Sequence, residues 1–300
     1  MRNRWWADPL AYAELFALNN VAFLAVDIAI AHAINAFAHR AEWVPVAFSV
    51  AASAVLVLSM VLGGLRPTLP GAEAEGRLGT RQRLARWLGL AVGWGSVAVG
   101  IAGLLLHLES QFFRDATLKN LVYSAPFVAP LSYAGVGLLI LLDRMVDSRS
   151  VDWARWLILL SLGGFLGNFI LSLADHAQNG FFRPEEWAGV VSAAAAVAFL
   201  AAVLIIPDNR PLIVLASWVV LAQIGVGVLG FYFHVRANLA NPAKSLADRF
   251  LYGAPAFAPL LFADLALLAL LAFWALVRVP SERHATGQLD GPARHSYDPE

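Results

Sequence analysis

The chain has 300 residues, of which 59% are hydrophobic and 14% are charged, and its formal net charge is zero. A surface this poor in charge cannot face water on all sides, so the composition excludes an ordinary soluble domain and indicates a membrane protein. The absence of cysteine excludes disulfides, thiolate metal sites and thiol catalysis. We expect the protein to interact mainly with the lipid bilayer and not with nucleic acid.

Eight apolar runs are long enough to cross a hydrocarbon core of roughly 30 Å as helices. They lie near residues 12–31, 44–64, 87–106, 121–142, 156–174, 188–206, 211–233 and 251–277. Their length, their Ala and Leu content and the lack of two-residue alternation argue against membrane strands. The sequence therefore predicts an all-α polytopic membrane protein with eight transmembrane helices.

Three segments of the first half return in the second half. The pairs are HAINAFAHRAEW (32–43) with HAQNGFFRPEEW (176–187), GIAGLLLH (100–107) with GVLGFYFH (227–234), and YSAPFVAPL (123–131) with YGAPAFAPL (252–260). We interpret them as a duplicated four-helix unit. Because four is an even number, the second unit enters the membrane in the same direction as the first, which predicts parallel repeats.

The predicted division of the chain is a first four-helix repeat over 1–150, a second over 151–280, and a polar, flexible cytoplasmic tail over 281–300. With the N-terminus inside, the inner segments carry 14 Arg or Lys residues and the outer loops carry 7. The positive-inside rule then predicts that both termini are cytoplasmic. The Ala- and Arg-biased composition suggests a multi-pass protein of the inner membrane of a bacterial cell.

Four histidines occupy matched positions where odd-numbered spans reach the outer boundary: His32, His107, His176 and His234. A histidine at a helix end is commonly an interfacial polar residue. Retention of all four in a duplicated chain instead favours a ligand role, since neutral imidazole is the commonest metal-binding side chain. We expect His32 to face His107 and His176 to face His234.

Glycines precede two of these histidines by four and seven residues, on the same helix face. They are Gly100 and Gly103 before His107, and Gly227 and Gly230 before His234. A flat macrocycle could lie along such a strip with its iron at the histidine, which predicts bis-histidine haem b. The alternative is close packing of membrane helices at small residues, with no ligand.

A bare transition-metal ion is the other candidate cofactor. Glu42 and Glu186 recur in register, each followed by a tryptophan, and could complete sites of histidines and carboxylates. The structural alternative is that each glutamate favours the N-terminus of the next helix while the tryptophan anchors it at the interface.

Two carboxylates within the spans, Asp27 and Asp264, have no acidic counterpart in the other repeat, where Leu171 and Gly135 stand. Ionisable groups in a membrane span are candidates for function. Together with the polar residues Asn168 and Gln223 they define a candidate path for a proton or cation.

The prolines of the two AP-x-x-AP segments, Pro126 with Pro130 and Pro255 with Pro259, predict a kink or irregular turn in the outer part of the fourth and eighth spans.

These features support three functional hypotheses. The leading one is a membrane protein whose paired histidines bind haem b or a transition metal for electron transfer or metal handling, with a membrane complex or a periplasmic redox protein as partner. The second is a proton- or cation-coupled transporter that uses Asp27 and Asp264. The third is a non-catalytic subunit of a membrane complex. The chain contains no P-loop, Gly-x-Ser-x-Gly or HExxH motif, so we do not expect a stand-alone enzyme.

Overall fold

The computed structural model describes residues 8–64, 78–123, 125–243 and 245–278, and within these ranges it is helical with no strand. The proposed tail over 281–300 lies outside the described residues. Seven helices are long and apolar enough to cross a membrane. The chain is therefore a multi-pass helical membrane protein, as the composition predicts.

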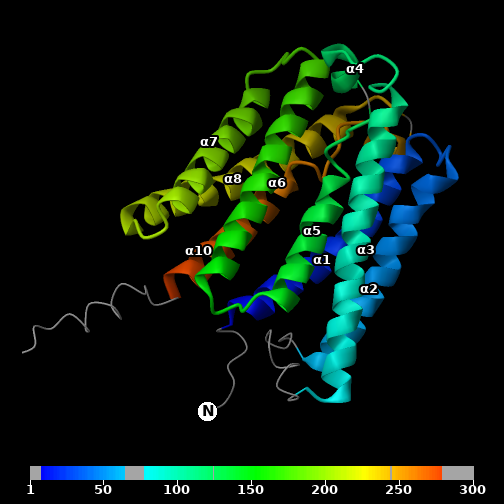
Figure 1. The fold of residues 1–300 in the computed structure, drawn as a ribbon. Coiled ribbons are helices and arrows are strands. Elements are labelled where there is room, and N and C mark those ends of the chain that lie inside the picture. The colour runs from blue at the N-terminus through cyan, green and yellow to red at the C-terminus, as the bar shows by residue number, and fades with distance from the viewer. Residues whose placement is uncertain (1–7, 65–77, 124, 244, 279–300) are drawn as a thin grey trace, which may run out of the picture.

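The helices follow one order twice along the chain (Figure 1). The first series is α1 (Pro9–Ala33), the short 3-10 turn η2 (Arg40–Glu42), α2 (Trp43–Gly63), α3 (Thr80–Ser110), α4 (Leu118–Tyr123) and α5 (Leu131–Met145). The second is α6 (Val151–Gln178), α7 (Glu186–Ile205), α8 (Arg210–Ala240), α9 (Leu246–Leu251) and α10 (Leu260–Arg278). In both series, three long helices are followed by a six-residue helix and then by one further helix.

Helix starts carry the expected capping residues. Asp8, Ser150 and Asn209 accept hydrogen bonds from backbone N–H groups of the first turns of α1, α6 and α8. These oxygens satisfy donors that have no partner within the helix. Local chemistry therefore fixes where these three helices begin.

The fourth apolar run differs from the prediction of one span over 121–142. It is divided into α4 and α5, with a turn between them that contains both prolines of the segment. The same division separates α9 from α10. α5 has 15 residues and extends about 22 Å at 1.5 Å per residue, too short to cross the hydrocarbon core alone. The prolines thus interrupt the helix as predicted, and α5 is not among the seven candidate spans.

Each series forms a four-helix bundle. In the first bundle (α1, α2, α3 and α5), α1 packs against α2 and α5, and α3 packs against the same two helices. In the second bundle (α6, α7, α8 and α10), α6 and α8 both pack against α7 and α10. α1 and α3, and likewise α6 and α8, are therefore diagonal to one another. The bundles meet through α5 with α6 and α1 with α10.

α10 is the most buried of the seven candidate spans. Half of its most apolar stretch is buried, against 28% or less for the other six. Its buried residues include the small Ala266, Ala269 and Ala272, which let neighbouring helices approach closely.

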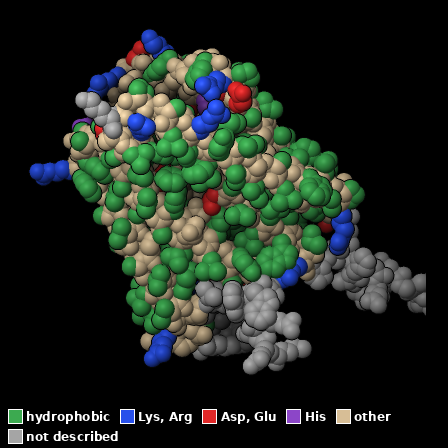
Figure 2. Space-filling model, turned by 180° about the vertical axis from the view of Figure 1, so that it is seen from behind, with side chains coloured by type: hydrophobic (Ala, Val, Ile, Leu, Met, Phe, Trp, Pro, Cys, Tyr) green, Lys and Arg blue, Asp and Glu red, His purple; other side chains and the backbone are tan. Residues whose placement is uncertain are grey.

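The surface has the distribution expected of a protein in a bilayer. Hydrophobic side chains cover the flank seen in Figure 2, whereas Lys and Arg side chains gather toward the two ends. The described chain begins at α1 and finishes at α10 on the same end of the molecule (Figure 1). We call this the far end, and the opposite one, where α1, α3, α6 and α8 finish, the histidine end.

Candidate functional site

The four predicted histidines form two pairs at the histidine end. The ring centres of His32 and His107 are 6.3 Å apart, with their planes at 71°. Those of His176 and His234 are 6.5 Å apart, with their planes at 82°. Each pair joins the ends of two diagonal helices, so the imidazoles face one another across the mouth of a bundle.

The proline segments hold one histidine of each pair. His107 Nδ1 donates to the carbonyl oxygen of Pro126 at 3.0 Å, and His234 Nδ1 donates to that of Pro255 at 2.8 Å. In a continuous helix this carbonyl would accept from the N–H four residues later. That residue is Pro130 or Pro259, which has no N–H. The same carbonyls accept from the N–H groups of Ala129 and Ala258, so the four-residue spacing of the prolines leaves one lone pair of each carbonyl for the histidine.

The other histidine of each pair is held differently in the two bundles. His32 Nδ1 lies 3.1 Å from the carbonyl oxygen of Ile28, one turn earlier in α1. His176 Nδ1 lies 3.5 Å from Glu186 Oε2. Because a carbonyl can only accept, Nδ1 of His32, His107 and His234 carries a proton, and in the neutral ring Nε2 then keeps its lone pair. That tautomer is the one that presents Nε2 to a metal.

A matched turn follows each first histidine. Phe37 and Phe181 adopt the left-handed backbone conformation, with φ of 54° and 51°. Their N–H groups lie within hydrogen-bond distance of the side-chain oxygens of Asn35 and Asn179, at 3.2 and 3.1 Å. Their N–H groups also donate to the carbonyls of His32 and His176, at 3.1 and 3.0 Å. The two asparagines therefore close these turns.

Aromatic stacking completes the turns. The ring of Phe37 stacks on Trp43 with centres 3.9 Å apart, and that of Phe181 stacks on Trp187 at 4.0 Å. The same phenylalanine rings lie 6.1 and 5.9 Å from His32 and His176. Each stack ties the end of one helix to the start of the next and borders the histidine pair with an apolar wall.

The two glutamates predicted as ligands lie beside the pairs. Glu42 Oε1 accepts from Asn35 Nδ2 at 3.0 Å, whereas Glu186 lies near His176. The Oε2 atoms of both are buried and have no hydrogen bond within the described ranges. Over the same residues, no three His, Cys, Asp or Glu side chains gather closely enough to hold a metal ion. The structure thus does not bring either glutamate into a three-ligand group with the histidines.

The glycines before His107 and His234 pack against the proline segments. A Cβ atom at Gly103 or Gly230 would lie 2.7 Å from the Cβ of Pro130 or Pro259, and one at Gly100 would lie 2.7 Å from the Ala134 backbone nitrogen. Protein atoms therefore cover this strip, in the close packing that was the alternative to a haem groove. A ligand-binding role for the four glycines stays a prediction.

The residues of the predicted ion path are not joined to one another. Asp264 on α10 accepts from Asn20 Nδ2 on α1 at 3.1 Å, which ties the two bundles together. Gln223 donates to the Ser192 carbonyl of α7 at 3.1 Å. In the described part of the chain, no hydrogen bond links Asp27, Asp264, Asn168 or Gln223 to another of the four.

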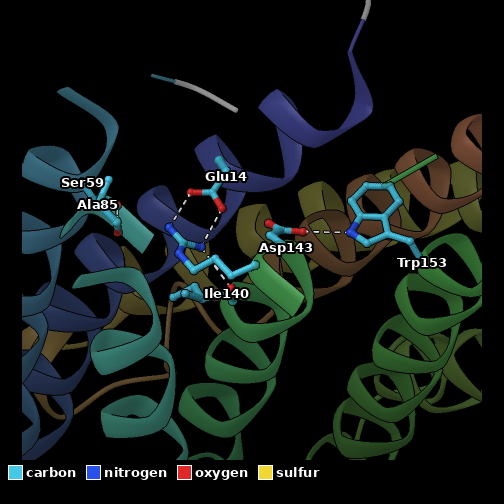
Figure 3. A network of polar contacts seen from close by, with 7 residues as sticks. Glu14, Ser59, Ala85, Ile140, Asp143 and Trp153 are labelled. Atoms are coloured by element: carbon cyan, nitrogen blue, oxygen red, sulfur yellow. Dashed lines mark hydrogen bonds and ion pairs between the residues drawn. The ribbon is translucent and has the colours of Figure 1, made fainter. Parts of the chain in front are cut away.

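Sequence reasoning missed a polar cluster near the far end (Figure 3). Arg144 of α5 donates to both carboxylate oxygens of Glu14 of α1, at 2.7 and 3.1 Å. Trp153 Nε1 of α6 donates to Asp143 Oδ1 at 3.1 Å. Glu14, Asp143 and Arg144 are 3%, 2% and 2% exposed. We refer to these four residues as the acidic–arginine cluster.

A glycine makes the cluster possible. A Cβ atom at Gly89 of α3 would overlap the guanidinium of Arg144, 1.6 Å from Nε. The signal in the sequence was Glu14, a lone acid in an apolar run. Arg144 gave no such signal. It lies next to a loop, so it was counted among the basic residues that the positive-inside rule assigns to the inner side.

Comparisons with protein-family models, curated proteins and solved structures find no match for this chain.

Proposed function

We propose that this membrane protein binds haem b at each of its two histidine pairs and takes part in electron transfer. The observation that carries the proposal is the separation of the rings, 6.3 and 6.5 Å. Two imidazoles that each hold one ion at about 2 Å have ring centres about 6 Å apart when the ion lies between them. The observed separations would therefore leave room for one ion in each pair, which supports a site with two histidine ligands, as in bis-histidine haem.

The partners of the imidazoles add support. Metal-binding histidines usually donate their other ring nitrogen to a carbonyl or a carboxylate, which fixes the ring and its tautomer. Here Pro126 and Pro255 supply such a carbonyl to His107 and His234. Phe37 and Phe181, which stack on Trp43 and Trp187, place an aromatic ring beside one histidine of each pair. Haem iron bound in this way would supply one-electron transfer.

The proposed topology is eight spans in two parallel four-helix repeats with both termini in the cytoplasm. The repeated helix order supports it, as does the shared position of the two ends of the described chain (Figure 1). In this topology α4 with α5, and α9 with α10, each form one interrupted crossing. Both histidine pairs then lie toward the outer face, the side to which this topology also assigns the basic side chains Arg40, Arg114, Arg183 and Arg236, which suit the carboxylates of haem.

An absorption spectrum of the purified protein tests this proposal. We expect a Soret band that corresponds to two haems per chain, and His107→Ala and His234→Ala should each remove about half of it because each breaks one of two pairs. His39→Ala is the matched control, since His39 is exposed and lies outside both pairs; it should leave the band intact.

Two results would overturn the proposal. A Soret band that is unchanged in both His107→Ala and His234→Ala would show that the histidine pairs do not bind the haem. Two stoichiometric metal ions per chain without a Soret band would replace haem with a bare transition metal at the same histidines.

A further inference from the structure

A second feature lies at the other end of the molecule and does not depend on the histidine pairs. We infer that the acidic–arginine cluster is a proton-binding site, in which Asp143 carries a proton that it donates toward the carboxylate of Glu14. The inference rests on the charge balance, burial and hydrogen bonds of the cluster.

The positive charge of Arg144 is already matched by Glu14. The two side chains meet as a fork, with Nη1 and Nη2 each donating to a different oxygen of Glu14 at 2.7 and 3.1 Å. Such two-point pairing is the strongest arrangement of a guanidinium and a carboxylate. Arg144 Nε finds no acceptor among the described residues, so no bond from it reaches Asp143.

Asp143 is left without a cation of its own. Its Oδ1 accepts from Trp153, whereas its buried Oδ2 receives no hydrogen bond from the described residues. The charged groups that act on Asp143 are Glu14 from α1 and Arg144 from its own helix. α6 contributes the neutral indole of Trp153.

An ionised Asp143 would put two negative charges and one positive charge in a space that is almost closed to solvent. An unpaired buried ion is strongly unfavourable, and two adjacent carboxyl groups relieve the repulsion by sharing one proton. A proton on Asp143 neutralises the surplus charge and lets the buried Oδ2, which receives no hydrogen bond from the described residues, act as a donor toward Glu14. The cluster thereby becomes neutral overall.

The second bundle has no equivalent site. By the offsets of the repeated segments, Ile158, Ala216, Ala272 and Phe273 stand where the first bundle has Glu14, Gly89, Asp143 and Arg144. All four are buried. The fold therefore does not require ionisable side chains here, and the protein binds one such proton per chain.

Infrared spectroscopy of the purified protein in phosphatidylcholine vesicles tests the inference. We expect a carbonyl band of a protonated carboxylic acid that shifts when aspartate is labelled with ¹³C and loses one component in Asp143→Asn. The variant should fold, because an amide can accept from Trp153 and donate to Glu14. Asp264→Asn is the control and should leave that component in place.

Two further variants separate a proton site from a merely structural acid. Glu14→Gln removes the competing carboxylate, so Asp143 should pair with Arg144 as an ion and the component should vanish although Asp143 is still present. Trp153→Phe removes the hydrogen bond to Oδ1 and should shift the component without abolishing it. If the carboxylic acid band of Asp143→Asn, Glu14→Gln and Trp153→Phe is the same as that of the parent protein, the inference is overturned. This outcome does not depend on the haem measurements.

Discussion

The two ends of the molecule differ in how closely the bundles resemble one another. At the histidine end, the ring separations, proline carbonyl bonds, left-handed turns and Phe–Trp stacks agree within a few tenths of an ångström between the bundles. At the far end, the buried Glu14, Asp143 and Arg144 of the first bundle correspond by sequence offset to the apolar Ile158, Ala272 and Phe273 of the second. Helices that pack in the same order therefore form without these three polar groups, whereas both bundles have the residues that surround the histidine pairs.

A second polar contact shows the same pattern. Tyr133 donates to the Pro45 carbonyl at 2.8 Å and lies 2.5 Å from the Ser49 hydroxyl. The counterparts of Tyr133 and Ser49 are Phe262 and Ala193, both buried. Replacement of a hydrogen-bonded pair by two apolar groups of similar shape is nearly neutral, which explains how both versions fit one fold.

The largest expected effect comes from breaking the acidic–arginine cluster. Arg144→Met leaves Glu14 as a buried, uncompensated charge and should cost about 3–5 kcal/mol of unfolding free energy. A fourfold variant can carry the apolar residues of the second bundle, through Glu14→Ile, Gly89→Ala, Asp143→Ala and Arg144→Phe. It should recover most of that loss, because no charge remains buried. Unfolding measured in detergent compares the two proteins. A fourfold variant less stable than Arg144→Met would contradict the equivalence of the bundles.

An intermediate effect is expected where the bundles match. Gly100→Ala and Gly227→Ala each force a Cβ atom against backbone atoms of the facing helix at 2.7 to 2.9 Å, and each should cost about 1–3 kcal/mol. The two losses should be similar. Gly135→Ala is the control, since nothing lies within 4 Å of its Cβ position, and it should be neutral or stabilising. Thermal unfolding of the three variants measures these changes in stability. A large difference between Gly100→Ala and Gly227→Ala would show that the two bundles are not packed alike at this position.

The smallest effect concerns the tyrosine pair. Tyr133→Phe alone should cost about 1 kcal/mol, because it removes two hydrogen bonds and leaves Ser49 with one fewer partner. The double variant Tyr133→Phe with Ser49→Ala reproduces the second bundle and should be closer to the parent protein than the single variant. A double-mutant cycle on the unfolding free energy measures the difference. If the losses of stability in Tyr133→Phe and Ser49→Ala simply add in the double variant, the two bundles do not correspond at this contact.

Much of the architecture could be predicted from the sequence because long apolar runs, prolines and repeated segments act locally. The break between α4 and α5 follows from the missing N–H groups of Pro126 and Pro130. The expectation that His32 faces His107 followed from their matched positions at the ends of two spans that finish on the same side. The number of candidate spans was less predictable, since the same prolines shorten α5 to 15 residues.

The acidic–arginine cluster could not be derived in the same way. Glu14 and Arg144 are 130 positions apart, and neither helix pattern specifies the other as a partner. Gly89 is one of 23 glycines, and only its contact with the guanidinium distinguishes it. Likewise, Asp264 stood out as a lone acid, but its bond to Asn20 depends on how α10 packs against α1.

The diagonal placement of the paired helices has a mechanical consequence. α1 and α3 each pack on α2 and α5. The distance between His32 and His107 therefore depends on how closely these two helices pack against α1 and α3. Larger or smaller side chains on α2 or α5 would widen or narrow that distance without altering a histidine, so residues remote from both imidazoles control their spacing.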